Sequence, residues 1–169
     1  MRVQGGMHDT VTMRDTVNLT FDTFCRREWA PLVATLSYLV GDRATGEDLA
    51  QEVLARAYQS WDRVGALDSP GGWAHRVGVN LASSHRRHLR IRARYLTSSL
   101  ELPSTDEPVD ALEVRRAVKE LPLTLRQAVV LRHVVGFSVE ETAAVLGITP
   151  EAVRVRAHRG ADRLRRQLR

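Results

Sequence analysis

Apolar residues recur at helical spacing along most of the chain, and no segment alternates apolar and polar residues as a half-buried strand would. Gly and Pro fall at the edges of long segments rich in Leu, Val, Ala and Arg. Because glycine and proline commonly end helices, each such segment predicts a separate helix. We therefore expect an all-α fold.

The first predicted helix spans residues 22–40 and ends at Gly41, a common C-terminal helix cap. Pro31 lies inside this helix and is expected to kink it or divide it in two. The second helix is expected to begin at 42–45 and to end near 61–64. Its apolar residues recur every four positions and predict one buried stripe, formed by Leu49, Val53, Ala57 and Trp61.

A loop with Gly and Pro at 65–72 leads to a third helix, expected at 73–95. We expect one face of this helix to be buried, the face formed by Trp73, Val77, Leu81 and Ser84. A second face has polar or cationic residues at steps of three and four and comprises Arg76, Asn80, Ser83, Arg87, Arg90 and Arg94. No acid lies between 69 and 95. This face indicates binding to nucleic acid or another polyanion, and a solvated helix face is the other interpretation.

The C-terminal part predicts a helix-turn-helix after helical segments at 109–121 and 122–135. Ser138 and Glu141 form a capping box at the start of a short helix that ends at Gly147. Thr149 then caps a longer basic helix whose buried stripe comprises Val153, Ala157, Ala161, Leu164 and Leu168. In such a motif the second helix enters the major groove of DNA, whereas a plain helical hairpin is the alternative.

The outer side of the last predicted helix carries Glu151, Arg154, Val155, His158 and Arg159. The first turns of a recognition helix reach base edges, so Arg154 and His158 are the expected base contacts. Phosphate contacts are expected from three further cations, Arg126, Arg132 and Arg159.

The charged residues of this chain of 169 residues are mostly arginines and are unevenly distributed. Lys and Arg total 25 against 20 Asp and Glu, and Lys119 is the only lysine, which favours the bidentate phosphate and base contacts that arginine makes. Residues 96–110 carry four acids and no base and lack an apolar period, as in a flexible linker.

No apolar run is long enough for a membrane span and no secretory signal is evident, so we expect a cytoplasmic protein without membrane insertion.

Three segments together resemble bacterial RNA polymerase sigma factors of the extracytoplasmic-function (ECF) class, group 4 of the sigma-70 family: GDRATGEDLAQEVLARAYQSWDRV, WAHRVGVNLASSHRRH and LPLTLRQAVVLRHVVGFSVEETAAVLGITPEAVRVRAHRGADRLRRQL. The resemblance covers about 21–95 and 109–169. It implies two small helical domains, a region 2-like bundle and a region 4-like helix-turn-helix, joined by the acidic linker at 96–108. Residues 1–20 form an N-terminal extension outside the resemblance.

The resemblance also implies roles for individual residues. Region 2 of the family grips the clamp helices of the polymerase β′ subunit, which here assigns polymerase contact to Asp48, Gln51 and Glu52. It also opens the −10 element, which assigns that role to the 65–72 loop and to Trp73, Arg76, Asn80, Ser83, Arg86 and Arg87. Trp73 is in register with Val77 and Leu81, which favours a place in the core over a DNA contact. Region 4 reads the −35 duplex, and Ala152, Val155 and Gly160 depart from the residues that are common there.

The partners implied by the resemblance are core RNA polymerase through its β′ and β subunits, promoter DNA and an anti-sigma factor. The sequence shows no Ser/His/Asp grouping, P-loop or dinucleotide fingerprint, so we expect neither a catalytic residue nor a cofactor. His85 and His88 lack a third ligand, so we expect no metal site. A stand-alone helix-turn-helix regulator that binds operator DNA without polymerase is the alternative function.

Overall fold

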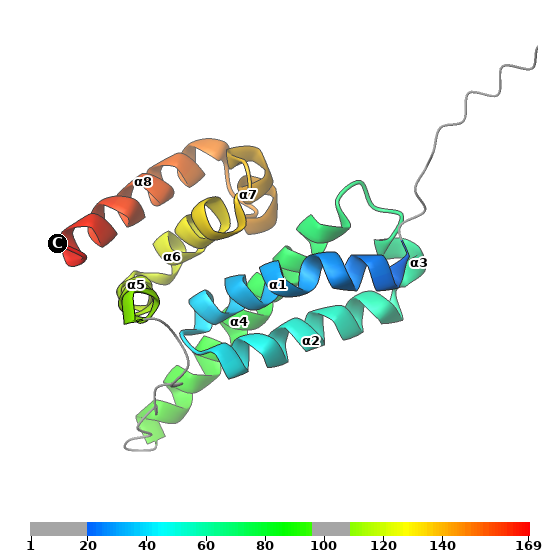
Figure 1. Cartoon of the computed structure of the whole chain (residues 1–169), viewed down its shortest axis with the longest axis horizontal. Coiled ribbons are helices and arrows are strands. Elements are labelled where there is room, and N and C mark those ends of the chain that lie inside the picture. Colours follow the sequence, from blue (N-terminus) through cyan, green and yellow to red (C-terminus); the bar gives the residue numbers. More distant parts are fainter. Residues whose placement is uncertain (1–19, 96–108) are drawn as a thin grey trace, which may run out of the picture.

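The computed structural model of the chain describes residues 20–95 and 109–169, and every regular element within these two ranges is a helix. The N-terminal extension up to residue 19 and the expected linker at 96–108 lie outside the described residues. Four helices come from the first range, and the helices of the second range pack along one side of them (Figure 1). The all-α prediction is confirmed.

Helices α1 (Phe21–Val40) and α2 (Arg43–Gln59) form an antiparallel hairpin. Gly41 adopts the left-handed conformation with φ of 93° and ends α1, as its position predicts. Helix α1 continues through Pro31, so the expectation that this proline divides the helix is wrong. Extensive packing against α2 and α4 keeps the helix intact although proline offers no N–H.

The second predicted helix is shorter than expected. It ends at Gln59, and Ser60 separates it from the one-turn helix α3 (Trp61–Val64). Val53 and Ala57 of the predicted stripe are fully buried, and Leu49 and Trp61 are half-buried. The hairpin is close-packed at Gly46, where a Cβ would lie only 2.6 Å from the Ser37 backbone nitrogen.

Helix α4 (Pro70–Tyr95) begins three residues earlier than the predicted start at Trp73, and the Ser69 hydroxyl accepts a hydrogen bond from the Gly72 N–H at 3.1 Å. Its buried face is also rotated from the prediction and consists of Ala74, His75, Gly78, Val79 and Ala82. Trp73, Val77 and Leu81 are half-buried, and Ser84 is exposed. Small residues face the hairpin because the helices approach closely; a Cβ on Gly78 would lie 3.1 Å from Leu36 Cδ2.

The C-terminal range forms α5 (Val109–Glu120), α6 (Leu123–Val129), the π-helical turn η1 (Val130–Val135), α7 (Val139–Leu146) and α8 (Pro150–Gln167). The predicted capping box is present, with the Glu141 N–H donating to Ser138 Oγ at 3.0 Å and the Ser138 N–H donating to Glu141 Oε2 at 2.7 Å. Thr149 caps α8 as expected. The helix-turn-helix of α7 and α8 is therefore confirmed.

The buried side of α8 differs from the predicted stripe at two positions. Leu168 lies past the end of the helix and is exposed, whereas Gly160 is buried against α6. A Cβ on Gly160 would collide with Cγ2 of Val129 and lie 3.4 Å from the Leu125 carbonyl oxygen. This departure from the common family residue therefore allows α6 and α8 to pack closely.

Replacing Gly160 with alanine is expected to destabilise the protein. Alanine gains about 1 kcal/mol in helix propensity, but overpacking costs about 1–3 kcal/mol, so we expect a net loss of about 1 kcal/mol in the free energy of unfolding. Urea denaturation checks the value. Val129→Ala removes the colliding methyl group, so the double variant should be more stable than the sum of the two single effects; simple additivity would contradict the packing argument.

The two halves of the chain pack directly on each other. Helices α5 and α6 and η1 contact α1, and α7 contacts α4 (Figure 1). Val130, Leu131 and Val145 belong to the same buried cluster as Leu32 and Leu36 of α1. A single apolar core thus runs from the N-terminal helices into the C-terminal ones.

Candidate nucleic-acid interface

One polar face of α2 is available to a partner. Asp48, Gln51 and Glu52 are all exposed, and their spacing along the helix places them on one side. The opposite side of α2 is buried at Ala50, Val53 and Ala57. Glu52 Oε1 accepts a hydrogen bond from Arg56 Nε at 2.8 Å, an exposed ion pair that a partner can exchange at little cost.

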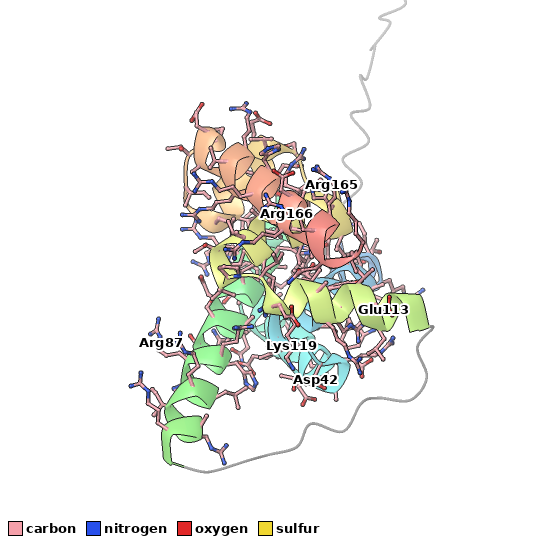
Figure 2. All side chains as sticks on the ribbon, turned by 90° about the vertical axis from the view of Figure 1, so that its left-hand side faces the viewer. Asp42, Arg87, Glu113, Lys119, Arg165 and Arg166 are labelled. Carbon is pink, nitrogen blue, oxygen red and sulfur yellow. The ribbon has the colours of Figure 1, made fainter. Side chains whose placement is uncertain are left out.

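A second face runs along α4 and is strongly cationic. Arg76, Asn80 and Arg87 are exposed, as expected for residues that contact a DNA strand. Arg90 and Arg94 continue the face and are also exposed. Nitrogen-tipped side chains gather along this helix, and Arg87 points away from the body of the molecule (Figure 2).

Two of the expected −10 residues in the middle of α4, Ser83 and Arg86, are half-buried. Ser83 is half-buried, and its hydroxyl donates to the Val79 carbonyl at 2.8 Å while accepting from Gln127 Nε2 at 3.2 Å. Arg86 is half-buried and donates to the Leu39 carbonyl at 3.2 Å. Burial and the neighbouring Arg90 lower the pKa of the Arg86 guanidinium.

A groove of about 870 Å³ separates this part of α4 from α5 and α6. Arg86, Arg87, Arg90 and Arg94 line one side, and Lys119 lies on the other. Among the described residues that line the groove, Glu120 is the one acid. Such a surface attracts anions because few carboxylates neutralise it.

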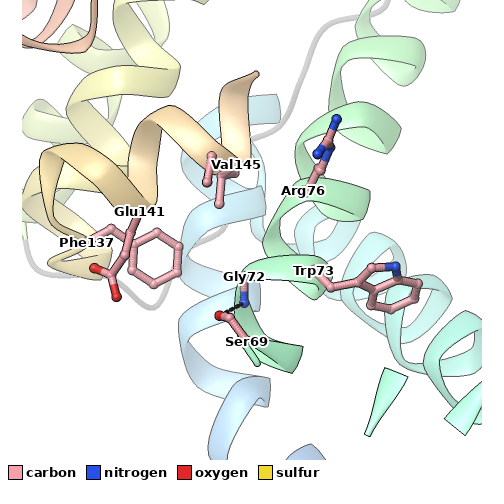
Figure 3. Close-up of a pocket in the computed structure, with 8 residues that line it drawn as sticks. Ser69, Gly72, Trp73, Arg76, Phe137, Glu141 and Val145 are labelled. Atoms are coloured by element: carbon pink, nitrogen blue, oxygen red, sulfur yellow. Dashed lines mark hydrogen bonds between the residues drawn. The ribbon is translucent and has the colours of Figure 1, made fainter. Parts of the chain in front are cut away.

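A smaller pocket of about 300 Å³ lies where the first turn of α4 meets the helix-turn-helix. Phe137 and Val145 face Ser69 and Gly72 across it, and Trp73 and Arg76 lie on its α4 side (Figure 3). Trp73 is half-buried, and its indole points away from Phe137 and Val145 (Figure 3).

His75 connects the same two parts of the chain. It is buried, its Nδ1 lies 3.0 Å from the Gly71 carbonyl oxygen, and its ring meets Phe137 edge-on with centroids 4.9 Å apart. Its Nε2 has no hydrogen-bond partner among the described residues. Burial lowers the pKa of His75, which outweighs the opposing effects of the Gly71 carbonyl and Glu28.

The lowered pKa of His75 predicts acid destabilisation. Below about pH 6.5 the unfolded chain binds a proton at this site before the folded chain does, so stability falls with pH by at most about 1.4 kcal/mol per unit. We expect His75→Asn, whose amide can replace the Nδ1 donor, to flatten this dependence in urea denaturation between pH 7.5 and 5.5. If the free energy of unfolding of the variant depends on pH as steeply as that of the wild type, groups other than His75 cause the dependence.

The expected −35 surface on α8 is exposed. Glu151, Arg154, Val155, His158 and Arg159 all lie on the surface. Arg154 is held by weak ion pairs, at 3.5 Å to Glu151 and 3.8 Å to Glu140, and His158 Nε2 lies 3.2 Å from Asp162 Oδ2. Exposed pairs of this kind contribute little stability, so both side chains can turn to a ligand.

The expectation that Arg126 lies at the surface as a phosphate contact is wrong in this structure. Its side chain is 1% exposed and donates to the Leu39 carbonyl at 2.8 Å, the Leu121 carbonyl at 3.0 Å and the Lys119 carbonyl. Burial and the neighbouring Arg86 lower its pKa to about 10, so it stays charged at neutral pH. Arg132 is half-buried and donates to the Phe137 carbonyl.

The sequence held a signal for the position of Arg126. It precedes Val129 and Val130, both buried, by three and four residues, and so lies on the buried side of α6. Its charge alone suggested the surface. Ser83 and Gln127 gave no such signal, because their contact joins residues 44 positions apart.

Within 20–95 and 109–169, no three His, Cys, Asp or Glu residues are grouped so that they could hold a metal ion. No helix in these ranges combines the length and apolar character needed to span a bilayer.

Comparison with known proteins identifies both parts of the chain. The family model described as Sigma-70 region 2 matches residues 26–92, and Sigma-70, region 4 matches 111–164. The solved structure of the sigma factor RpoE in complex with the anti-sigma factor NepR from Bartonella quintana has the same fold. Its TM-score is 0.71 at 23% identity, over 88% of this chain and 96% of that chain.

Curated relatives align along nearly the whole sequence. The RNA polymerase sigma-E factor of Streptomyces antibioticus is 31% identical over 153 residues, which cover 89% of this chain and 85% of the relative. The RNA polymerase sigma factor CarQ of Myxococcus xanthus is 31% identical over 165 residues, covering 92% of each. The ECF RNA polymerase sigma factor SigE of Mycolicibacterium smegmatis is 35% identical over 82% of this chain and 58% of its own length. This chain therefore belongs to the ECF class of RNA polymerase sigma factors, which direct the polymerase to promoters.

Proposed function

We propose that three faces of this sigma factor divide the work of promoter recognition. The polar face of α2, formed by Asp48, Gln51 and Glu52, binds the β′ clamp helices of core RNA polymerase. The cationic face of α4 holds a DNA strand at the −10 element, and α8 reads the −35 duplex. The observation that carries this proposal is the separation of an exposed acidic face on α2 from an acid-free arginine face on α4.

Opening of the −10 element requires a base to leave the stack, which costs a few kcal/mol that protein contacts must offset. Arg76 and Arg87 are placed to bind phosphates of the separated strand, because both are exposed on one side of α4. Asn80 lies between them and is small enough to leave room for a nucleotide. Trp73 belongs to the first turn of α4, which follows the loop at 65–69, and a base can stack on its indole.

Recognition of the −35 element relies on the first turns of α8. Arg154 can donate two hydrogen bonds to the edge of a guanine, and Val155 offers an apolar contact to a thymine methyl group. His158 lies one turn later and reaches a second base edge, whereas Arg159 beside it contacts the backbone of the duplex.

This chain works as a recognition subunit and not as an enzyme, since the polymerase carries out the chemistry. Its place is the cytoplasm, where the polymerase acts. RpoE of Bartonella quintana and CnrH were both solved as complexes, with NepR and with the cytosolic domain of CnrY, respectively. We infer that an anti-sigma protein of this kind also sequesters the present chain.

Reconstituted transcription tests the proposal. Purified core RNA polymerase is mixed with this protein on fragmented DNA of its host, and the 5′ ends of the RNA are sequenced. We expect new start sites that share paired upstream elements. If active core gives no specific starts while the protein alone binds duplex operators, the stand-alone regulator becomes the better account.

A further inference from the structure

The groove between α4 and the α5–α6 segment concentrates positive charge that the chain itself does not neutralise. Four arginines line its α4 side, namely Arg86, Arg87, Arg90 and Arg94. In the described part of the chain, none of the four forms an ion pair with a carboxylate. On α2, by contrast, Arg43 pairs with Glu47 and Arg56 pairs with Glu52, both at 2.8 Å. The guanidinium groups of the groove are therefore available to an anion from outside the chain.

Like charges near the groove act on one another. Burial and the neighbouring Arg90 lower the pKa of Arg86, and burial and Arg86 lower the pKa of Arg126 to about 10. Arg126 also lines the groove, and its Nε has no hydrogen-bond partner among the described residues. These guanidinium groups are thus held charged beside other cations without a counter-ion. An anion bound in the groove would offset the repulsion and stabilise their charged forms.

The side of the groove opposite α4 adds one more cation and an apolar wall. Lys119 lies there, and Figure 2 labels it together with Arg87 on α4. The wall consists of Leu121, Pro122 and Leu123. A volume of about 870 Å³ is typical of sites for small molecules, which combine apolar walls with a few charged groups. This two-sided shape favours a compact ligand over an extended DNA strand, for which the open face of α4 suffices.

We propose that this groove binds a compact anion with several adjacent phosphates, either a nucleoside triphosphate or an inorganic polyphosphate. Guanidinium groups donate paired hydrogen bonds to phosphate oxygens. Arg87, Arg90 and Arg94 follow one another at steps of three and four along α4, so neighbouring arginines can hold neighbouring phosphates. Lys119 binds the phosphates from the other side as a point charge. The site is additional to promoter recognition and does not depend on it.

Titration calorimetry on the full chain tests the site, at about 0.15 M salt so that distant surface charges are screened. The probes are inorganic tripolyphosphate, ATP and inorganic phosphate. We expect a Kd of roughly 10 µM for tripolyphosphate and binding of single phosphate about ten-fold weaker or more, since several charge-assisted hydrogen bonds are then lost. Tighter binding of ATP than of tripolyphosphate would identify a nucleotide as the ligand. Equal or weaker binding of ATP would identify the phosphate chain alone.

Substitutions on both sides locate the bound anion. Arg90→Gln and Lys119→Gln should each weaken the binding of tripolyphosphate about ten-fold, because each removes a charge-assisted contact. Arg92→Gln makes the same change in net charge at an exposed position of α4 outside the groove. This control variant should bind tripolyphosphate nearly as tightly as the wild type.

Removal of the acid in the groove should have the opposite effect. Glu120→Gln should tighten the binding of tripolyphosphate about two- to five-fold, and a gain of affinity cannot result from misfolding. The glutamine oxygen can still accept the hydrogen bond that Glu120 Oε2 accepts from Gln167 Nε2 at 2.8 Å. Glu113→Gln removes an exposed acid of α5 outside the groove and is the matched control, with no change expected.

Three results would overturn the proposal and leave the function proposed for α2, α4 and α8 standing. The first is no binding of tripolyphosphate at about 1 mM, far above the Kd expected for several charge-assisted contacts. The second is a loss in Arg90→Gln without a loss in Lys119→Gln, which places the anion on the open face of α4. The third is an equal loss in Arg92→Gln and Arg90→Gln, which assigns the effect to net charge.

Discussion

Replacing Asp48 and Glu52 with arginine is expected to abolish transcription by this sigma factor while leaving its fold intact. Both carboxylates are exposed on α2, so their reversal disturbs no packing, and the lost pair between Glu52 and Arg56 contributes only about 0.5 kcal/mol. At an interface, each charge that is buried with a partner contributes about 2 kcal/mol or more. We therefore expect the Kd for core polymerase to rise by about thirty-fold to a thousand-fold.

The measurement is competition for core polymerase against the labelled wild-type protein, together with transcription from a mapped promoter. Asp62→Arg combined with Glu113→Arg makes the same change in net charge at exposed positions outside α2, and should bind normally. Retained binding by the α2 variant would remove Asp48 and Glu52 from the polymerase interface. Equal losses in both variants would assign the effect to net charge.

Replacing Arg154 and His158 with alanine is expected to relax recognition of particular base pairs in the −35 element. Both side chains project from the first half of α8 and are held only by weak exposed ion pairs. Each good base contact contributes about 1–3 kcal/mol of discrimination, so the preferred base should lose roughly ten- to a hundred-fold of its advantage. Base-pair changes at the other positions of the −35 element should weaken binding of the variant as much as they weaken binding of the wild type.

Binding of a library of −35 duplexes, at two salt concentrations, checks this expectation. A uniform loss over all sequences with a smaller dependence on salt would instead make the two residues phosphate contacts. Arg165→Ala, in the last turn of α8, is the matched control, because it removes one exposed charge far from the first turns. It should change affinity slightly and specificity not at all.

The helix ends marked by a predicted glycine stop or side-chain cap were the most predictable part of this fold. The stop at Gly41, the capping box of Ser138 and Glu141, and the cap at Thr149 all lie where the sequence places them. Each depends on hydrogen bonds between residues a few positions apart, so local sequence suffices to specify it. The order of caps then defines the helix-turn-helix, and with it the exposed positions of α8.

The buried face of α4 was harder to predict, because it depends on two neighbours at once. Periodicity favoured Trp73, Val77 and Leu81, the larger apolar residues. The structure instead buries Ala74, Gly78 and Ala82, which let the α1–α2 hairpin approach, while the larger residues stay half-buried at the edge of this contact. The size of the apolar side chains shows which side of a helix is buried only when the distance to the neighbouring helix is known.

The sequence by itself determined the class of fold, the helix-turn-helix and the family, because all three rest on short-range patterns and on motifs in a fixed order. Only the tertiary structure decided that Arg126 is buried, that Ser83 contacts Gln127 and that Arg86 donates to the Leu39 carbonyl. The acceptor for Arg126 and Arg86 is the carbonyl of Leu39, 87 and 47 residues away along the chain. Burial of a cation depends on which distant backbone group comes within hydrogen-bond range, and that is set by how the two domains pack.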